Sequence, residues 1–224
     1  MGNKKALILF SGGLDSTTVL HHALSKGYDC TALTIDYNQR HSYEVKSSQE
    51  YLKKESIDGL IFKIDLSQIG GSALTDNEIK VPVEYQDGIP ITYVPARNTI
   101  FLSIASAYAE KLMIPEIFIG VNQIDYSGYP DCRPEFVDSF QNTIKLGTKV
   151  GVSDNSILIN APLINMTKVE IIRYGIELGI DYSRTVSCYQ MDSEGRACGI
   201  CDSCKFRKEG FELAGIIDPT RYIN

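Results

Sequence analysis

One stretch near the N-terminus, Ser11-Gly12-Gly13-Leu14-Asp15-Ser16, combines two hydroxyls, two glycines and a carboxylate between a strand pattern and a helix pattern. The apolar run Ala6–Phe10 predicts a strand buried on both faces of a parallel sheet, and the periodicity from Thr17 to Lys26 predicts a helix. Glycine permits positive φ in the loop, while free N–H groups at the helix N-terminus attract anions. The stretch therefore predicts a phosphate-binding site.

A second group of reactive side chains lies near the C-terminus. Four of the six cysteines fall between positions 188 and 204, namely Cys188, Cys198, Cys201 and Cys204. Thiolates at this spacing favour a tetrahedral structural Zn²⁺ with no open position for catalysis. An iron–sulfur cluster and a redox Cys-x-x-Cys pair remain alternatives. The surrounding residues mix basic and acidic side chains, which argues against a zinc ribbon that binds nucleic acid.

Composition limits the class of protein. A chain of 224 residues with 43% hydrophobic residues has enough apolar material for a folded core. The formal net charge of -6 argues against a nucleic-acid partner. No apolar run approaches the ~20 residues that span a bilayer, so no membrane association is expected. We expect a cytoplasmic enzyme with a nucleotide-binding domain at 1–180 and a zinc-binding region at 181–224 packed on it.

Strand and helix patterns alternate along the chain, which predicts an α/β fold: a doubly wound, mostly parallel sheet of about five strands flanked by helices. The helix expected over Thr99–Leu112 is apolar almost all round and should be buried. Residues 65–92 lack clear periodicity and are expected to form a long loop or lid. The strands are expected near 6–10, 31–35, 60–64, 116–120 and 157–159, and the helices near 17–26, 42–55, 99–112, 134–146 and from 167 onward.

Other polar side chains follow the predicted strands. In doubly wound sheets, ligands bind at the carboxyl ends of the strands, so these loops should meet at one edge. Arg40 and His41 follow the second strand, Arg97 lies just before the helix expected from Thr99, and Lys168 lies at the start of the last predicted helix. Arginine suits forked recognition of phosphate or carboxylate, and lysine acts as a mobile point charge. These residues are candidate contacts for phosphate or substrate.

The six-residue stretch resembles the PP-loop, the SGGxDS signature of ATP pyrophosphatases, which transfer AMP to a substrate oxygen and release pyrophosphate. The resemblance implies that the adenine lies against the end of the second strand and that Mg²⁺ accompanies ATP beside Asp15, since a carboxylate and a phosphate repel. The implied ATP-binding residues are Phe10, Ser11, Gly12, Gly13, Leu14, Asp15, Ser16 and Arg40.

A wider set of motifs narrows the resemblance to the QueC family of 7-cyano-7-deazaguanine synthases, over nearly the whole chain and in order. The set comprises SGGLDS, Tyr37–His41, Val94–Asn98, Asp125–Arg133, Thr167-Lys168 and the four cysteines. Asn38 departs from the pattern, because glycine is expected there. The family implies ATP-dependent conversion of 7-carboxy-7-deazaguanine and ammonia to 7-cyano-7-deazaguanine, through adenylated carboxylate and amide intermediates, in queuosine biosynthesis.

The resemblance also suggests roles, which are hypotheses. Asp15, Arg97 and Lys168 are the candidate catalytic residues, and Asp125, Tyr129 and Asp131 are the candidates for binding the purine-like substrate. A homodimer is expected from the family alone. Two other readings stay open: a PP-loop enzyme that modifies tRNA, of the thiolase or lysidine synthase type, and a non-catalytic nucleotide-binding zinc module. A catalytic Cys132 would favour thiolation.

Overall fold

The computed structural model describes residues 4–40, 43–83, 88–124, 128–153 and 156–223. Within these residues, five strands form one sheet in the order β3-β2-β1-β4-β5, and every neighbouring pair is parallel. The predicted α/β class and strand number are therefore confirmed. The strands are β1 (Lys4–Leu9), β2 (Tyr28–Asp36), β3 (Asp58–Lys63), β4 (Glu116–Phe118) and β5 (Leu158–Asn160).

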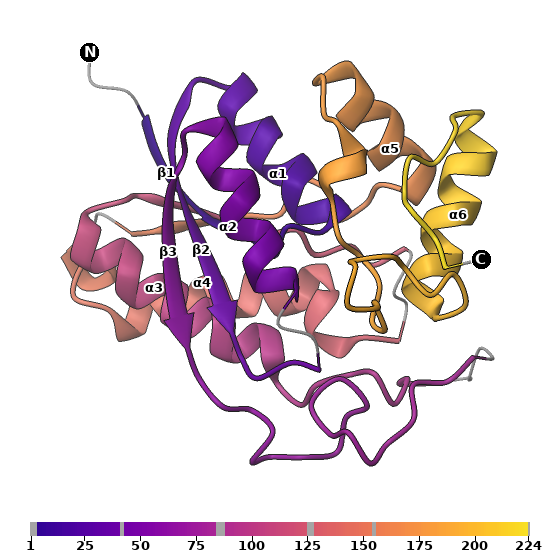
Figure 1. The fold of residues 1–224 in the computed structure, drawn as a ribbon. Helices are drawn as coiled ribbons and strands as arrows, with labels where there is room; N and C mark the ends of the chain where they lie inside the picture. Colours follow the sequence, from indigo (N-terminus) through magenta and orange to yellow (C-terminus); the bar gives the residue numbers. More distant parts are fainter. Residues whose placement is uncertain (1–3, 41–42, 84–87, 125–127, 154–155, 224) are drawn as a thin grey trace.

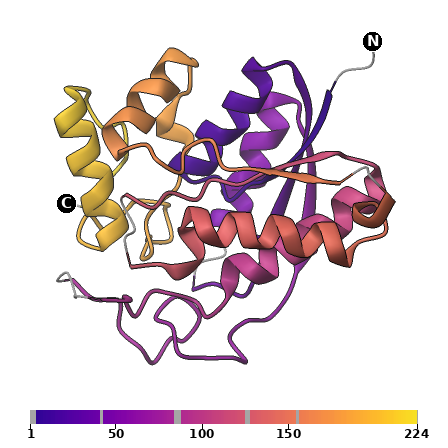
Figure 2. The same ribbon diagram turned by 180° about the vertical axis from the view of Figure 1, so that it is seen from behind.

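Helices cover both faces of the sheet. Figures 1 and 2 show α1 and α2 on one side and α3 and α4 on the other, while α5 and α6 lie together beside α1. The described parts of the segment that joins β3 to α3 form a long loop below the sheet in Figure 1. The helices are α1 (Leu14–Ser25), α2 (Tyr43–Glu55), α3 (Arg97–Leu112), α4 (Pro134–Gly147), α5 (Lys168–Glu177) and α6 (Asp202–Ala214), with short 3₁₀ turns at Pro130–Cys132, Gly151–Ser153 and Tyr182–Arg184.

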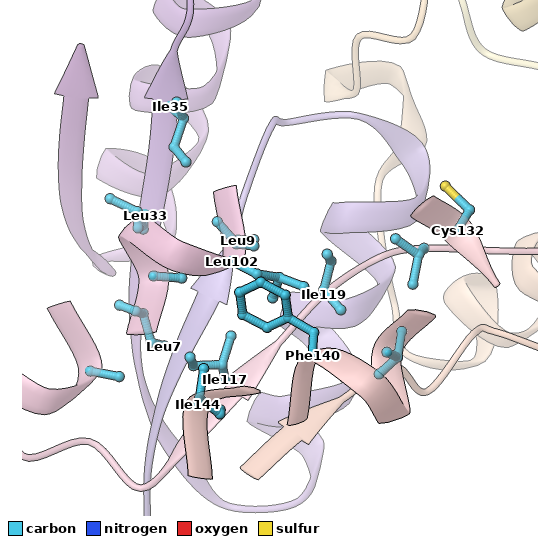
Figure 3. Packing of buried hydrophobic residues seen from close by; sticks show 14 of the residues in the cluster. Leu7, Leu9, Leu33, Ile35, Leu102, Ile117, Ile119, Cys132, Phe140 and Ile144 are labelled. Carbon is cyan, nitrogen blue, oxygen red and sulfur yellow. The ribbon is translucent and has the colours of Figure 1, made fainter. Parts of the chain in front are cut away.

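The central strand β1 supplies both halves of the core. Leu7 and Leu9 pack into the apolar cluster on the α3 and α4 side, which Figure 3 shows around Leu102 and Phe140. Ala6 and Ile8 face the opposite cluster, formed with α1, α2 and α5. Successive side chains of a strand point to opposite faces, so a strand buried on both faces must be apolar throughout. This explains the continuous apolar run.

The chain order of the strands creates a crevice. From β1 the chain proceeds to β2 and β3 on one side, and then returns to place β4 and β5 on the other side of β1. The loops after β1 and β4 therefore diverge at a topological switch point, where open α/β sheets bind ligands. The fold thus brings the loop of Ser11–Gly13 to the edge where a binding site is expected.

Three helices differ from the prediction. Helix α1 begins at Leu14, three residues before the expected Thr17. Helix α3 begins at Arg97, two residues earlier than expected, and is buried along only one face, which includes Leu102, Ala105 and Ala109. Helix α6 has no counterpart among the predicted helices; it begins directly after Cys201 and packs against α5. Within the described residues, no helix combines the length and apolar character that crossing a bilayer requires.

Candidate active site

A cavity lies at the carboxyl ends of β1, β2 and β4, as the strand order predicts. Its walls come from the loop after β1, the first turn of α2, the start of α3 and the start of α5. The cavity brings together most of the residues predicted from sequence. It is lined by Phe10, Ser11, Gly13, Leu14, Asp15, Ser16, Arg40, Arg97, Tyr129 and Lys168.

Hydrogen bonds of two serine hydroxyls fix the conformation of the loop after β1. The Ser11 and Ser16 Oγ atoms lie 3.0 Å apart, and the Ser11 backbone N–H donates to Ser16 Oγ at 3.2 Å. Ser16 Oγ also donates to the Gly13 carbonyl at 3.2 Å. Gly13 is the N-cap of α1 and has no side chain to satisfy the first N–H groups of the helix. These donors are available to an anion.

Two glycines permit close approaches at this loop. Gly12 has φ of +78°, and a Cβ at this position would lie 3.2 Å from Ser48 Cβ of α2. At Gly120, just after β4, a Cβ would lie 3.2 Å from the Ser16 backbone nitrogen. A side chain at Gly120 would push β4 away from the N-terminus of α1. Both positions therefore require glycine to keep the crevice walls together.

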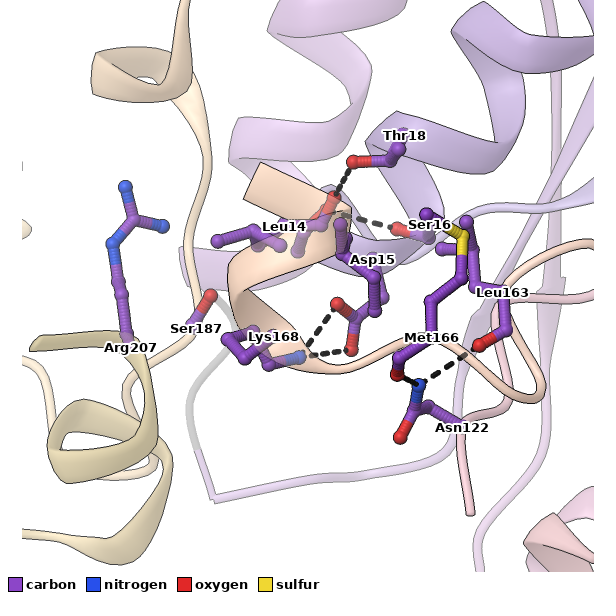
Figure 4. A network of polar contacts seen from close by, with 12 residues as sticks. Leu14, Asp15, Ser16, Thr18, Asn122, Leu163, Met166, Lys168, Ser187 and Arg207 are labelled. Carbon is purple, nitrogen blue, oxygen red and sulfur yellow. Dashed lines mark hydrogen bonds and ion pairs between the residues drawn. The ribbon is translucent and has the colours of Figure 1, made fainter. Parts of the chain in front are cut away.

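An ion pair between α1 and α5 forms part of the cavity wall. Lys168 Nζ, at the start of α5, lies 2.7 Å and 3.0 Å from the two carboxylate oxygens of Asp15 (Figure 4). Asn122, which follows β4, donates to the carbonyls of Leu163 and Met166 and so fixes the turn before α5. A capping box of Thr167 and Glu170 begins that helix, as predicted. The charged Lys168 side chain is thus positioned from three segments.

The predicted motifs around Arg97 and Asp131 are joined by hydrogen bonds. The N-cap of α3 is Ala96, which offers no capping side chain. Asp131 supplies the missing acceptor: its Oδ2 accepts the Asn98 backbone N–H at 3.0 Å, and its carbonyl accepts from Asn98 Nδ2 at 3.0 Å. A carboxylate near a helix N-terminus also complements the helix dipole. In the described structure Asp131 supports the helix that carries Arg97 and does not line the cavity.

Arg97 also lines the cavity, where it lies among phenols. Burial opposes its charge, but Tyr37, Tyr129, Cys132 and Asp131 together raise the pKa of the Arg97 guanidinium, so it stays cationic. The Tyr129 hydroxyl lies 2.9 Å from Thr92 Oγ1, which joins the segment before α3 to the segment after β4. A fixed cation beside aromatic rings can hold a carboxylate or a phosphate.

Glu44, in the first turn of α2, also lines the cavity and was not singled out from the sequence. Burial raises the pKa of its carboxyl group to about 7, against the opposing influence of Arg97 and a hydrogen bond from Gln39. No local motif marks Glu44, because the predicted helix that carries it is mostly polar and a single glutamate in its first turn gives no signal of its own. Only the packing of α2 against the loop after β1 brings its carboxyl group into the cavity.

Four further predicted residues do more than line the cavity, or do not line its described part. Arg40 lines the cavity, but its guanidinium donates to the carbonyls of Ala73, Asn77 and Ile79 at 3.1 to 3.2 Å. It therefore organises the start of the long β3–α3 segment as well. Gly12 shapes the loop without lining the cavity. Asp125, like His41, lies outside the described residues.

Cys132 lies at the cavity wall but is unsuited to nucleophilic work. It is buried, and burial raises the pKa of its thiol to about 12, even though Arg97 favours the thiolate. The side-chain amide of Asn98 approaches its Sγ at 3.5 Å. Because the thiolate is the reactive form, a thiol with this pKa is inert at neutral pH.

The four C-terminal cysteines form a compact cluster. Their Sγ atoms all lie within 4.8 Å of one another, and three of the four residues are buried. Backbone N–H groups point at the sulfurs, from Gln190 and Cys198 to Cys188 Sγ at 3.2 Å and from Cys201 to Cys198 Sγ at 3.4 Å. This donor set can bind one metal ion. A single tetrahedral zinc needs sulfurs about 3.8 Å apart, since Zn–S bonds are about 2.3 Å long.

The cysteine cluster adjoins the cavity. Cys188 lines the cavity wall, and the Val186 backbone N–H donates to the Gly12 carbonyl at 3.0 Å. The buried Arg207 of α6 braces this segment through Asp218 at 3.1 Å, Thr185 Oγ1 at 2.8 Å and the Tyr182 carbonyl at 3.0 Å. A metal in the cluster would therefore stabilise one wall of the site.

The five-stranded parallel sheet, the SGGLDS loop at its switch point and the four-cysteine cluster define a nucleotide-binding α/β protein of the PP-loop type. The family described as "Queuosine biosynthesis protein QueC" matches residues 5–215. The chain therefore belongs to the QueC family.

Curated relatives cover the full chain. The 7-cyano-7-deazaguanine synthase of Saccharophagus degradans is 56% identical over 225 residues, spanning 100% of both chains. The 7-cyano-7-deazaguanine synthase of Cellvibrio japonicus is 55% identical over 223 residues, spanning 99% of both. Among solved structures, a predicted subunit of tRNA methyltransferase from Methanocaldococcus jannaschii aligns with a TM-score of 0.50 at 15% identity. That alignment covers 99% of this chain and 92% of the other, and it supports the fold alone.

Proposed function

We propose that this protein converts 7-carboxy-7-deazaguanine, ammonia and ATP to 7-cyano-7-deazaguanine, the product for which its relatives are named. A carboxylate is a poor electrophile, because substitution at its carbon would have to expel an oxide ion, which is a very poor leaving group. Attack of a carboxylate oxygen on the α-phosphate of ATP gives an acyl adenylate and pyrophosphate, and ammonia then displaces AMP to give an amide. A second adenylation, on the amide oxygen, lets the nitrogen lone pair expel AMP and form the nitrile.

The observation that carries the proposal is the Lys168–Asp15 pair beside the free N-terminus of α1. ATP would place its phosphates against the loop of Ser11–Gly13 and the first N–H groups of α1, with its adenine near the end of β2. Lys168 would then face the pyrophosphate part of ATP, which gains negative charge as it leaves. Preorganised positive charge of this kind stabilises phosphoryl and adenylyl transfer. We assign Asp15, Arg97 and Lys168 the catalytic roles.

The substrate would occupy the Arg97 end of the cavity. Arg97 is suited to pair with the substrate carboxylate or the α-phosphate, because its guanidinium is cationic and faces the cavity from the start of α3. Tyr129 offers a hydroxyl and a ring at the same end. Asp125 is proposed to bind the purine-like edge, since carboxylates accept from paired N–H donors. Asp131 contributes by holding α3, and Arg40 by shaping the wall near ATP.

Two metals are proposed. The residues that would hold Zn²⁺ are the four clustered cysteines, whose sulfurs lie close enough together to bind one ion. In a cluster of four irons, each cysteine would bind a different iron, and the four sulfurs would lie farther apart. The zinc would fix the fold of a C-terminal region, 181–224, packed on the nucleotide-binding domain, 1–180. Asp15 would hold Mg²⁺ bound with ATP, which neutralises phosphate charge. A homodimer and a cytoplasmic location stay predictions.

Replacing Arg97 with alanine is expected to lower nitrile formation by about a hundredfold to a thousandfold, because a fixed charge on the reacting groups is lost. The fold should persist, since Asp131 still caps α3 through the Asn98 backbone. Steady-state kinetics with urea unfolding checks both expectations. Arg173→Ala, on an exposed face of α5, is the matched control and should leave turnover unchanged. Wild-type turnover by Arg97→Ala would remove Arg97 from the mechanism.

The proposed function itself is tested with purified protein, ATP, Mg²⁺, ammonium and 7-carboxy-7-deazaguanine. We expect pyrophosphate release that depends on the deazaguanine and a product with the mass of the nitrile. Pyrophosphate release with a tRNA substrate, and none with the deazaguanine, would instead favour the tRNA-modifying alternative. ATP binding without pyrophosphate release under either condition would favour the non-catalytic module.

A further inference from the structure

The cavity contains a second carboxylate that the proposed phosphate chemistry does not use. Of the two carboxylates that line its described part, Asp15 is paired with Lys168, whereas Glu44 forms no ion pair with a described residue. Glu44 lies in the first turn of α2, and the cation that acts on its carboxyl group is Arg97 of α3. Its carboxyl group is thus placed beside the group proposed to hold the reacting carboxylate.

A hydrogen bond from Gln39 positions the Glu44 carboxyl group, and no ion pair with a described residue balances its charge. The Gln39 side-chain oxygen accepts the Tyr37 backbone N–H at 3.0 Å, so its amide nitrogen faces Glu44 and donates to it. Among the described residues, the titratable and charged groups that act on the Glu44 carboxyl group are Arg97 and Tyr37. Burial raises the pKa of Tyr37 to about 12, so this phenol stays protonated and uncharged at neutral pH.

The proposed reaction needs a base at this position. Ammonia is mostly ammonium at neutral pH, and ammonium has no lone pair with which to attack an acyl adenylate. A carboxylate in a cleft can act as such a base when it lies within hydrogen-bond reach of the proton that it takes. We propose, on the basis of the proposed function, that Glu44 is the catalytic base that binds ammonium in the cavity and takes a proton from it.

The step balances without another reactant. The Glu44 carboxylate takes one proton from ammonium, and the freed nitrogen lone pair forms the C–N bond at the acyl carbon. The C–O bond to the adenylate then breaks, and its electron pair leaves on AMP. The nitrogen loses a second proton to water, which gives the neutral amide. The pKa of Glu44, raised by burial to about 7, suits proton transfer near neutral pH.

The test compares Glu44→Gln with wild type in two half-reactions. Pyrophosphate exchange into ATP, driven by 7-carboxy-7-deazaguanine without any amine, reports adenylation and should be unchanged in the variant. Amide and nitrile formation from ammonium at pH 7 should fall about a hundredfold, the scale of general-base catalysis. Glu50→Gln, on an exposed position of the same helix, is the matched control and should match wild type in both assays.

Two further readouts separate a base from a residue that only shapes the site. The wild-type rate with ammonium should rise with pH and level off above about 7, once Glu44 has lost its proton, whereas the Glu44→Gln rate should keep rising above that pH because the variant depends on free ammonia. Hydroxylamine, which is largely unprotonated at pH 7, should form the hydroxamate at near wild-type rate in the variant.

The outcomes are distinct. Equal losses with hydroxylamine and ammonium, lost pyrophosphate exchange in the variant alone, or unchanged amide formation would each overturn the assignment of Glu44 and leave the proposed function standing. Absence of substrate-driven exchange in the wild type would overturn the proposed function, and the Glu44 assignment with it.

Discussion

Replacing Lys168 with methionine is expected to lower nitrile formation about a thousandfold and to destabilise the fold by roughly 3 kcal/mol. The catalytic loss follows from removing the cation at the phosphate end of the cavity. The loss of stability has a separate cause. Lys168 is largely buried against Asp15, and its removal leaves a carboxylate without its partner. Single-turnover kinetics and urea unfolding measure the two effects on the same preparation.

A double variant separates these causes. Asp15→Asn combined with Lys168→Met removes both charges, so most of the lost stability should return while turnover stays at the level of Lys168→Met. Lys46→Met is the matched control: its ion pair with Glu50, at 4.0 Å, is exposed, and its loss should cost less than about 1 kcal/mol. Restored turnover in the double variant would show that Lys168 acts only by neutralising Asp15.

Replacing Cys201 with serine is expected to release the metal and to destabilise the chain by more than about 4 kcal/mol. Cys201 is a proposed zinc ligand and a buried residue directly before α6, so its replacement removes one of the four metal ligands that would anchor the start of that helix. The wall formed by Cys188 and Val186 should then loosen, and turnover should fall with stability. Metal analysis per chain and urea unfolding check the expectation.

Cys30→Ser is the matched control for the cluster. Cys30 is also buried, but it lies in β2, outside the cluster, and its variant should keep the full metal content. A stable, active and metal-free Cys201→Ser protein would refute structural zinc. Bound iron with the absorption of a cluster, in protein purified without oxygen, would instead favour the iron–sulfur alternative.

The sheet and the phosphate loop were predictable because local signals and the global fold agree there. The apolar run of β1 is typical of a strand in a parallel sheet that helices cover on both faces. The glycines after it indicate a tight loop between this strand and the following helix, so the local and global signals agree. The capping box at Thr167 likewise marked the start of α5. The cysteine spacing predicted the cluster, since those residues are close in sequence.

Features that depend on distant contacts were not predictable. Asp131 caps α3 across 33 positions, so the sequence offered its carboxylate for substrate binding and gave no sign of the Asn98 backbone as its partner. Helix α6 was missed because its N-cap and first turn carry two metal-ligand candidates, Cys201 and Cys204, which obscure the helical pattern. Glu44 faces the cavity only because α2 packs beside the loop after β1. In each case a tertiary contact decides the role, and a linear pattern does not contain it.

The central claim is that AMP is transferred to the oxygens of the substrate carboxylate. The most direct measurement uses 7-carboxy-7-deazaguanine with both carboxylate oxygens labelled with ¹⁸O, followed by mass analysis of AMP after complete conversion to the nitrile. The account predicts two AMP per nitrile, each carrying one ¹⁸O, because each oxygen leaves on an adenylate. Label in inorganic phosphate or in water, with unlabelled AMP, would contradict the account.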